Sequence, residues 1–176
     1  MLRLWHYPSK IISLSDGFFM LDRIDIALLR LLRKNARLPN KDLAEKTAIA
    51  PSTALERVRR LHESKAILGY HAEIAPRALG IGMQAMVAVR LARHSRELVD
   101  SFQAHLGRQR EVIAYYHLAG ADDFLVHVGA RDADHLRELT LAIFTERPEV
   151  AHIQTQLIFD FRRSVELPVL WAGDAA

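Results

Sequence analysis

The sequence contains no cysteine, and this absence excludes disulfide scaffolds, cysteine-ligated zinc, iron–sulfur clusters and thiol nucleophiles. It also has no run of the roughly 20 uninterrupted apolar residues that a membrane span requires. Residues 11–20 are partly apolar, but serine, aspartate and glycine interrupt them, and no small-residue cleavage pattern is present. We therefore expect a cytoplasmic protein without a membrane partner.

The net charge of +3 is unevenly spread along the 176 residues. Residues 21–80 hold 12 Lys/Arg against 7 Asp/Glu, a net +5, whereas residues 81–176 hold 10 against 13, a net −3. A basic N-terminal block favours a polyanionic partner, because each phosphate contact releases condensed counterions. The apolar share of 50% is ordinary for a folded chain of this length, which can form two small cores.

Three short helices are predicted within residues 21–66. Asp22 is a candidate N-cap of the first helix and Asn40 of the second, while Pro51 stands at the first position of the third, which runs to about Lys65. The first helix has one apolar stripe, and so does the third. These stripes are Ile24, Ala27, Leu28, Leu31 and Leu32, and Ala54, Leu55, Val58 and Leu61. A tight turn before a basic third helix is typical of a DNA-binding helix-turn-helix.

A connecting strand and hinge are predicted over residues 67–82. Residues 67–74 are expected to be extended, as a wing or a connecting strand, and residues 75–80 are rich in turn formers. This segment separates the helix-turn-helix domain from the second half of the chain.

The second half, residues 83–164, predicts the order βαββαβ, which is the ferredoxin-like arrangement. The expected strands are 83–92, 112–119, 124–130 and 150–161, with one helix after Ser95 and one after Asp132 or Asp134. Helices cover one face of such a sheet, so the other face needs a partner. Apolar groups expected on that face, depending on strand phase, are Tyr115 or Tyr116 and Leu157 or Ile158. Dimerisation through this open face is therefore expected.

The order of these parts and the residues within them resemble the Lrp/AsnC (feast/famine) family of transcriptional regulators over about residues 20–165. The matching stretches are Leu21-Asp22-Arg23-Ile24-Asp25, Asp42-Leu43-Ala44, Pro51-Ser52-Thr53, Arg57-Val58-Arg59-Arg60-Leu61, Ile67-Leu68-Gly69-Tyr70, Gly120-Ala121-Asp122-Asp123-Phe124 and Thr155. We take residues 1–20 as an N-terminal extension, with Met20 as a candidate native start, and residues 165–176 as a C-terminal tail. The apolar tail is expected to pack on a neighbouring subunit or on its own sheet.

The resemblance implies dimers, often rings of dimers, and an amino-acid-like effector between regulatory domains. It places the recognition helix at residues 52–65 and the effector loop at residues 120–123. This sequence departs from the family at three positions. Ala50 replaces the usual capping serine, Glu56 stands where a basic residue is common, and Lys65 replaces a glycine, which predicts a different turn after the third helix.

The candidate DNA-binding residues divide by chemistry. Phosphate contacts are expected from Lys41, Arg57, Arg59 and Arg60, and base-edge contacts from Ser52, Thr53 and Glu56. The alternative is a solvated helix in which Glu56 pairs with Arg60 at i+4. In that interpretation Arg57 could brace a neighbouring helix.

The candidate effector-binding residues are Gly120, Ala121, Asp122, Asp123 and Thr155. The glycine permits a tight turn, Asp123 could attract an ammonium group, and Thr155 offers a hydroxyl. A plain hairpin turn rich in glycine and aspartate explains the same loop without a ligand. The nine histidines lack metal-ligand spacing, so no metal site is predicted.

The sequence therefore predicts an α+β protein, with an N-terminal winged helix-turn-helix followed by a ferredoxin-like βαββαβ regulatory domain. We expect a sequence-specific DNA-binding regulator that responds to a small molecule, with no cofactor and no catalytic residues. Two alternatives are an enzyme like the sirohaem decarboxylases, which share this architecture, and a stand-alone ligand-sensing or assembly module. The basic, proline-opened third helix favours DNA binding over both.

Overall fold

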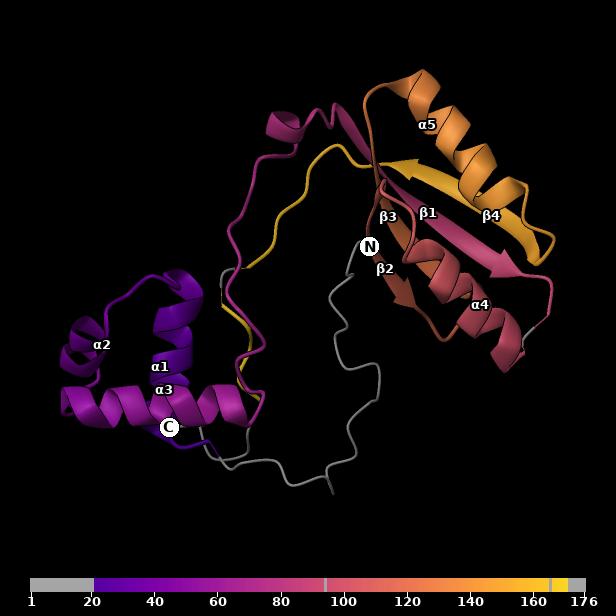
Figure 1. Cartoon of the computed structure of the whole chain (residues 1–176). Helices are drawn as coiled ribbons and strands as arrows, with labels where there is room; N and C mark the ends of the chain where they lie inside the picture. The colour runs from indigo at the N-terminus through magenta and orange to yellow at the C-terminus, as the bar shows by residue number, and fades with distance from the viewer. Residues whose placement is uncertain (1–20, 94, 165, 171–176) are drawn as a thin grey trace. The chain divides into compact units, whose positions relative to one another are not determined.

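The computed structural model divides into two compact units (Figure 1). The sheet unit comprises residues 74–161, and the helical unit comprises residues 21–73 together with 162–170. The residues that the structure describes are 21–93, 95–164 and 166–170. The predicted N-terminal extension and the end of the tail lie outside these residues. Within them, no helix is long and apolar enough to cross a lipid bilayer.

The helical unit begins with α1 (Arg23–Lys34), and Asp22 caps this helix as predicted. The Asp22 carboxylate accepts a hydrogen bond from the backbone N–H of Asp25 at 2.8 Å. The Asp25 carboxylate in turn accepts one from the backbone N–H of Asp22 at 3.4 Å. This reciprocal pair satisfies two N–H groups that have no partner within the helix.

The second helix, α2 (Asn40–Lys46), begins one residue earlier than predicted. Asn40 was expected to cap it but is its first helical residue, and Pro39 occupies the cap position without a side-chain hydrogen bond. The prediction was wrong because the extended backbone of Pro39 already makes the transition into the helix.

The third helix, α3 (Pro51–Glu63), has Pro51 in its first turn as predicted, and Ala50 caps it without a side-chain hydrogen bond. Ala54 and Leu61 of the predicted apolar face are buried, but Leu55 is 55% exposed. Leu55 follows Ala54 directly, and one residue turns a helix by about 100°, which carries it off the buried line. The core of the unit is formed by Leu28, Leu32, Leu43, Leu61 and Ile67.

Two residues without glycine's freedom have left-handed backbone, Ala48 between α2 and α3 (φ 53°) and Lys65 after α3 (φ 63°). The predicted departure at the end of α3 is therefore wrong, because Lys65 takes the conformation that glycine would favour. The turn lets the backbone N–H of Ile67 donate to the carbonyl of Leu61 at 3.0 Å. It thereby brings Ile67 into the core, where it is buried.

The segment between α3 and the sheet contains no strand among the described residues. Residues 67–74 were expected to be extended as a wing or connecting strand, but they have no strand partner in this chain. A single turn of 3-10 helix, η1 (Pro76–Leu79), follows and ends at Gly80 in left-handed conformation (φ 78°).

The sheet unit has the predicted βαββαβ order. Its elements are β1 (Met83–Leu91), α4 (Arg96–Leu106), β2 (Val112–His117), β3 (Phe124–Ala130), α5 (Ala133–Thr140) with a π-helical turn η2 (Leu141–Thr145), and β4 (Val150–Leu157). Within residues 74–161 the strands form an antiparallel sheet in the order β2-β3-β1-β4 (Figure 1). Ser95 caps α4 and Asp132 caps α5, so the sequence located both helix starts.

Two strands end earlier than predicted. β2 ends at His117 instead of residue 119, and β4 ends at Leu157 instead of residue 161. β4 stops pairing where β1 begins, because Leu157 lies opposite Ala85 and only one further bond follows, from the N–H of Ile158 to the carbonyl of Gln84.

Both helices of the sheet unit cover the same face of the sheet. Val87 and Val89 of β1 pack with Phe102 of α4 and Leu139 of α5 in one buried cluster. Directly opposed residues of antiparallel strands share a face, so Tyr115, which lies opposite Val126, faces the helices. Alternation then assigns the other, open face to Met86, Ala88, Gln84, Leu125, His127 and Tyr116.

The C-terminal segment returns to the helical unit. Arg33 Nη2 donates to the carbonyl of Ser164 at 3.4 Å, and Lys34 forms an ion pair with Glu166. The described part of the tail therefore contacts α1, and not its own sheet as one of the two predictions had it. Residues 162–164 also group with the helical unit instead of the regulatory domain to which the sequence assigned them.

Candidate DNA-binding surface and effector loop

The exposed face of α3 forms a shallow groove of about 410 Å³. It is lined by Ser52, Thr53, Glu56, Arg57 and Arg60, and all five were predicted to contact DNA. Ser52, Thr53 and Glu56 are exposed, and Arg57 and Arg60 are partly so. The structure therefore brings hydroxyl, carboxylate and guanidinium groups together on one accessible side of a helix.

Lys41 and Arg59 do not line this groove. Lys41 is exposed near the start of α2 and has no ion pair among the described residues. Arg59 Nη2 lies 3.0 Å from Glu56 Oε1, and Arg59 Nε lies 3.7 Å from Glu63 Oε1. The hydrogen bond from Glu56 and its charge raise the pKa of Arg59. Glu56 thus pairs at i+3 with Arg59, and not with Arg60 as the alternative interpretation predicted.

Arg57 braces α3 against α1, which was one of the two interpretations of this residue. Its Nη1 lies 2.6 Å from Asp22 Oδ2 and 2.9 Å from Asp25 Oδ1. These hydrogen bonds, first that to Asp22, raise the pKa of Arg57. Burial alone would raise the pKa of Asp22, but the N–H of Asp25 and the Arg57 guanidinium outweigh it and lower that pKa.

Asp25 is a functional candidate that the sequence did not reveal. Its side chain is only 3% exposed, and its two oxygens accept from Arg60 Nη2 at 3.2 and 3.0 Å, in addition to the bond from Arg57. The sequence indicated only that Asp25 places negative charge in the first turn of α1. One signal was available: Asp25 is an acidic residue beside the apolar stripe of a short helix, and buried carboxylates require partners.

The predicted effector loop is tied to the end of β1 through Asp123. The Asp123 carboxylate, in a residue only 6% exposed, accepts a hydrogen bond from the backbone N–H of Leu91 at 2.7 Å. The backbone N–H of Asp123 donates to the carbonyl of Val89 at 2.9 Å. Asp122 is half-buried, has no hydrogen bond or ion pair among the described residues, and is preceded by exposed Gly120 and Ala121.

Thr155 does not adjoin this loop within the chain. It is exposed on β4 and lies opposite Val87 of β1, whereas Asp123 is bonded to Val89 from the β3 side. The strand β1 therefore separates Thr155 from the loop. A ligand that touches both from within one subunit would have to cross this strand.

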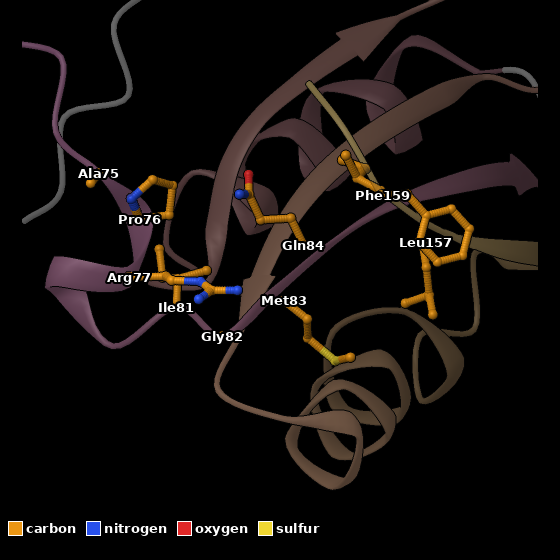
Figure 2. Close-up of a pocket in the computed structure, with 10 residues that line it drawn as sticks. Ala75, Pro76, Arg77, Ile81, Gly82, Met83, Gln84, Leu157 and Phe159 are labelled. Atoms are coloured by element: carbon orange, nitrogen blue, oxygen red, sulfur yellow. The ribbon is translucent and has the colours of Figure 1, made fainter. Parts of the chain in front are cut away.

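A second concavity, of about 520 Å³, lies at the opposite end of β1 from the loop (Figure 2). Ten residues line it: Ala75, Pro76, Arg77, Ile81, Gly82, Met83, Gln84, Leu157, Ile158 and Phe159. Arg77 is the charged member, and none of the ten is acidic. This pocket thus lacks the carboxylate that would attract the ammonium group of an amino acid.

His127 lies on the open face of the sheet and is 8% exposed. Its Nε2 lies 2.8 Å from Gln84 Oε1, and its ring centroid lies 6.2 Å from that of Phe161. Burial lowers the pKa of His127. Among the described residues no group of three or more His, Cys, Asp or Glu is placed to hold a metal ion.

Comparisons with known proteins match both halves of the chain. The family model of the AsnC-type helix-turn-helix domain matches residues 21–62, and that of the Lrp/AsnC ligand binding domain matches residues 84–164. The chain is 45% identical over 143 residues to the HTH-type transcriptional regulator AldR of Mycolicibacterium smegmatis, covering 81% of this chain and 84% of that protein. It is 28% identical over 150 residues to the leucine-responsive regulatory protein of Haemophilus influenzae, covering 85% and 90%.

Solved structures agree with these relatives. A crystal structure of MtbAldR matches with a TM-score of 0.66 and 37% identity, covering 84% of this chain and all of that one. A transcriptional regulator from Neisseria meningitidis in complex with L-Met matches with a TM-score of 0.78 and 27% identity, covering 84% and 96%. These relatives are named as transcriptional regulators and not as enzymes, so they give no support to the decarboxylase alternative.

Proposed function

The chain belongs to the Lrp/AsnC family and is a transcriptional regulator with a DNA-binding helix-turn-helix and a ligand-binding domain, and we propose that α3 reads operator sequence in a major groove. The observation that carries this proposal is the groove on α3, where Ser52, Thr53 and Glu56 are exposed beside two arginines. Hydroxyl and carboxylate groups can bond base edges, and guanidinium groups can bond bases or phosphates. In the cytoplasm, where we place the protein, DNA is the polyanion available to this surface.

The test is selection of bound fragments from genomic DNA by the full-length protein, followed by titration of a selected fragment against random duplex. We expect a preference of at least about 10³-fold for the selected fragment at moderate salt. Equal affinity for selected and random duplex would contradict the proposal. Substitution of both Ser52 and Thr53 by alanine should lower the preference while leaving affinity for random duplex unchanged.

For the ligand, we propose an amino acid held at the loop 120–123, with Thr155 contributed by a neighbouring subunit. The neighbour from Neisseria meningitidis, which is a complex with L-Met, supports this ligand class. Asp122 supports the location, because its carboxylate has no partner among the described residues and can attract an ammonium group. Asp123 is already bonded to Leu91, so we assign it to shaping the loop.

The ligand proposal is tested by thermal denaturation of the full-length protein with each of the twenty amino acids. At least one should raise the melting temperature of the wild type, and Asp122→Asn should abolish that increase. Thr155→Val should weaken it. Arg77→Ala, at the other end of β1, serves as the control and should leave it intact. An increase that survives Asp122→Asn but is lost in Arg77→Ala would move the site to the second pocket.

For assembly, we propose a homodimer that covers the open face of the sheet and associates into a higher homo-oligomer. Met86, Leu125 and Tyr116 give this face apolar character, and Tyr116 is 53% exposed in the single chain. Burial of such a surface on a second copy removes apolar area from water. Sedimentation of the wild type against Tyr116→Asp tests it, and we expect the variant to dissociate at concentrations where the wild type remains assembled.

A further inference from the structure

We infer that Asp25 of α1 is a specificity-determining residue, which restrains the arginines of the recognition helix so that they do not bind phosphate indiscriminately. The inference rests on the proposed DNA binding by α3. It concerns a residue outside that helix and on the far side of the arginines from the groove. Asp25 is a positioning residue here, since it acts through Arg57 and Arg60.

The geometry places two guanidinium groups on one buried carboxylate. Asp25 Oδ1 accepts from Arg57 Nη1 at 2.9 Å, and Asp25 Oδ2 accepts from Arg60 Nη2 at 3.0 Å. The side chain of Asp25 is 3% exposed, against 21% for Arg57 and 44% for Arg60. The carboxylate is thus covered by the two arginines, while the arginines themselves reach the surface.

Charge balance explains why these contacts persist when DNA is present. Asp22 and Asp25 offset the charges of Arg57 and Arg60, so the cluster of four is neutral. If both arginines turned to phosphates, they would leave Asp25 buried without a countercharge, which is strongly unfavourable. At least one arginine therefore stays on Asp25, and Arg57, the more buried and doubly bonded, is the one held most firmly.

Arg60 is held by one end only. Its contacts with Asp25 both use Nη2, and a guanidinium group carries five N–H donors in a fixed fork. The remaining donors lie on a side chain that lines the groove with Ser52 and Thr53. Asp25 therefore fixes the plane and direction in which Arg60 can present its free donors.

A restrained arginine contributes differently from a free one. Phosphates occur along every duplex, so a mobile arginine gains affinity on any DNA and adds to the salt dependence of binding. An arginine with fixed direction gains only where the DNA places an acceptor along that direction. Asp25 should consequently lower affinity for random DNA more than it lowers affinity for the operator.

The experiment compares wild type, Asp25→Asn and the matched control Asp22→Asn, all full-length. Asparagine keeps the shape of aspartate and removes its charge, and Asp22 contacts Arg57 but not Arg60. Dissociation constants are measured on a selected genomic fragment and on random duplex across about 50–200 mM salt. Asp25→Asn should bind random duplex several-fold more tightly, with a salt slope steeper by up to about one, and should lose part of its preference. Asp22→Asn should change these quantities much less.

A second variant separates restraint from a merely structural role. Arg60→Gln removes the guanidinium, so Asp25→Asn made in that background should no longer tighten binding to random duplex. Arg60→Gln alone should weaken operator binding more than random binding, and this comparison remains available if Asp25→Asn does not fold. The inference is overturned if a folded Asp25→Asn leaves both affinities unchanged or weakens them equally, or if Arg60→Gln weakens both equally. If the wild type prefers no fragment, it is the proposed function that fails.

Discussion

The carboxylate of Asp123 accepts a hydrogen bond of 2.7 Å from the backbone N–H of Leu91, so the loop before β3 is fastened to the last residue of β1. The bond is buried and joins residues that lie 32 positions apart in the sequence. It gives the acidic loop a structural role that does not depend on any ligand.

Asp123→Ala should therefore destabilise the protein. The substitution leaves the N–H of Leu91 buried without an acceptor, which costs about 1–3 kcal/mol of unfolding free energy. Urea denaturation measures the change. Asp122→Ala, at the half-buried neighbour, is the control and should stay within about 0.5 kcal/mol of the wild type. Equal stabilities for the two variants would show that the bond contributes nothing.

Lys65→Gly should stabilise the helical unit. Lys65 has a φ of 63°, a conformation that costs a residue with a Cβ about 1 kcal/mol and costs glycine little. We expect a gain of up to about 1 kcal/mol in unfolding free energy, reduced by the greater freedom of glycine in the unfolded chain. Lys65→Ala removes the long side chain but keeps the Cβ, and should leave stability unchanged. A destabilised glycine variant would contradict the assignment of strain to this residue.

Acid should destabilise the sheet unit through His127. Burial lowers the pKa of His127 in the folded protein, whereas the unfolded chain takes up a proton near pH 6.5. The stabilising contribution is fully present above that pH and is lost as the pH falls below it, because the unfolded state then binds more protons. Thermal denaturation between about pH 7.5 and 5.5 should show this loss, and His127→Gln should reduce it.

Some acid sensitivity should remain in the His127→Gln variant. Burial also lowers the pKa of His105, outweighing the hydrogen bond to the carbonyl of Ile143, so this group contributes with the same sign. A variant with the same pH dependence as the wild type would show that His127 is not the group responsible.

Lys41→Ala should weaken binding to all DNA about equally. Lys41 is exposed and has no ion pair among the described residues, so its charge is available to a phosphate. Loss of one phosphate contact should reduce the slope of log affinity against log salt by about 0.9. Arg59→Ala, whose charge is offset by Glu56 and Glu63, should reduce the slope less. A selective loss of operator binding in Lys41→Ala would instead assign this residue to base readout.

The parts of the fold that local chemistry determines could be predicted from the sequence. Asp22, Ser95 and Asp132 each cap a helix, because a short oxygen-bearing side chain before an apolar stripe is a local signal. Alternation in β1 and β3 determined which side chains face α4 and α5. The strand ends were less predictable, because β4 ends where its partner β1 begins, and the pairing register is a tertiary property.

The candidate sites were predicted in composition but not in connection. Arg57 and Arg60 were identified on α3, yet their partner Asp25 lies 32 and 35 residues earlier on another helix. Lys65 in a turn that favours glycine was also unpredictable, because the packing of Ile67 on Leu61 requires that turn. Thr155 and the effector loop were grouped by resemblance, and the sheet order sets them on opposite sides of β1.

The return of the C-terminal segment to α1 has a practical consequence for work with fragments. A recombinant piece that stops at residue 66 would lack the carbonyl bonded to Arg33 and the carboxylate paired with Lys34. Conversely, proteolytic cleavage within the linker at residues 68–75 would leave residues 162–170 still attached to the sheet and still able to hold the severed helices. The two halves are doubly tethered, so chimaeras made with relatives should exchange both crossing segments together.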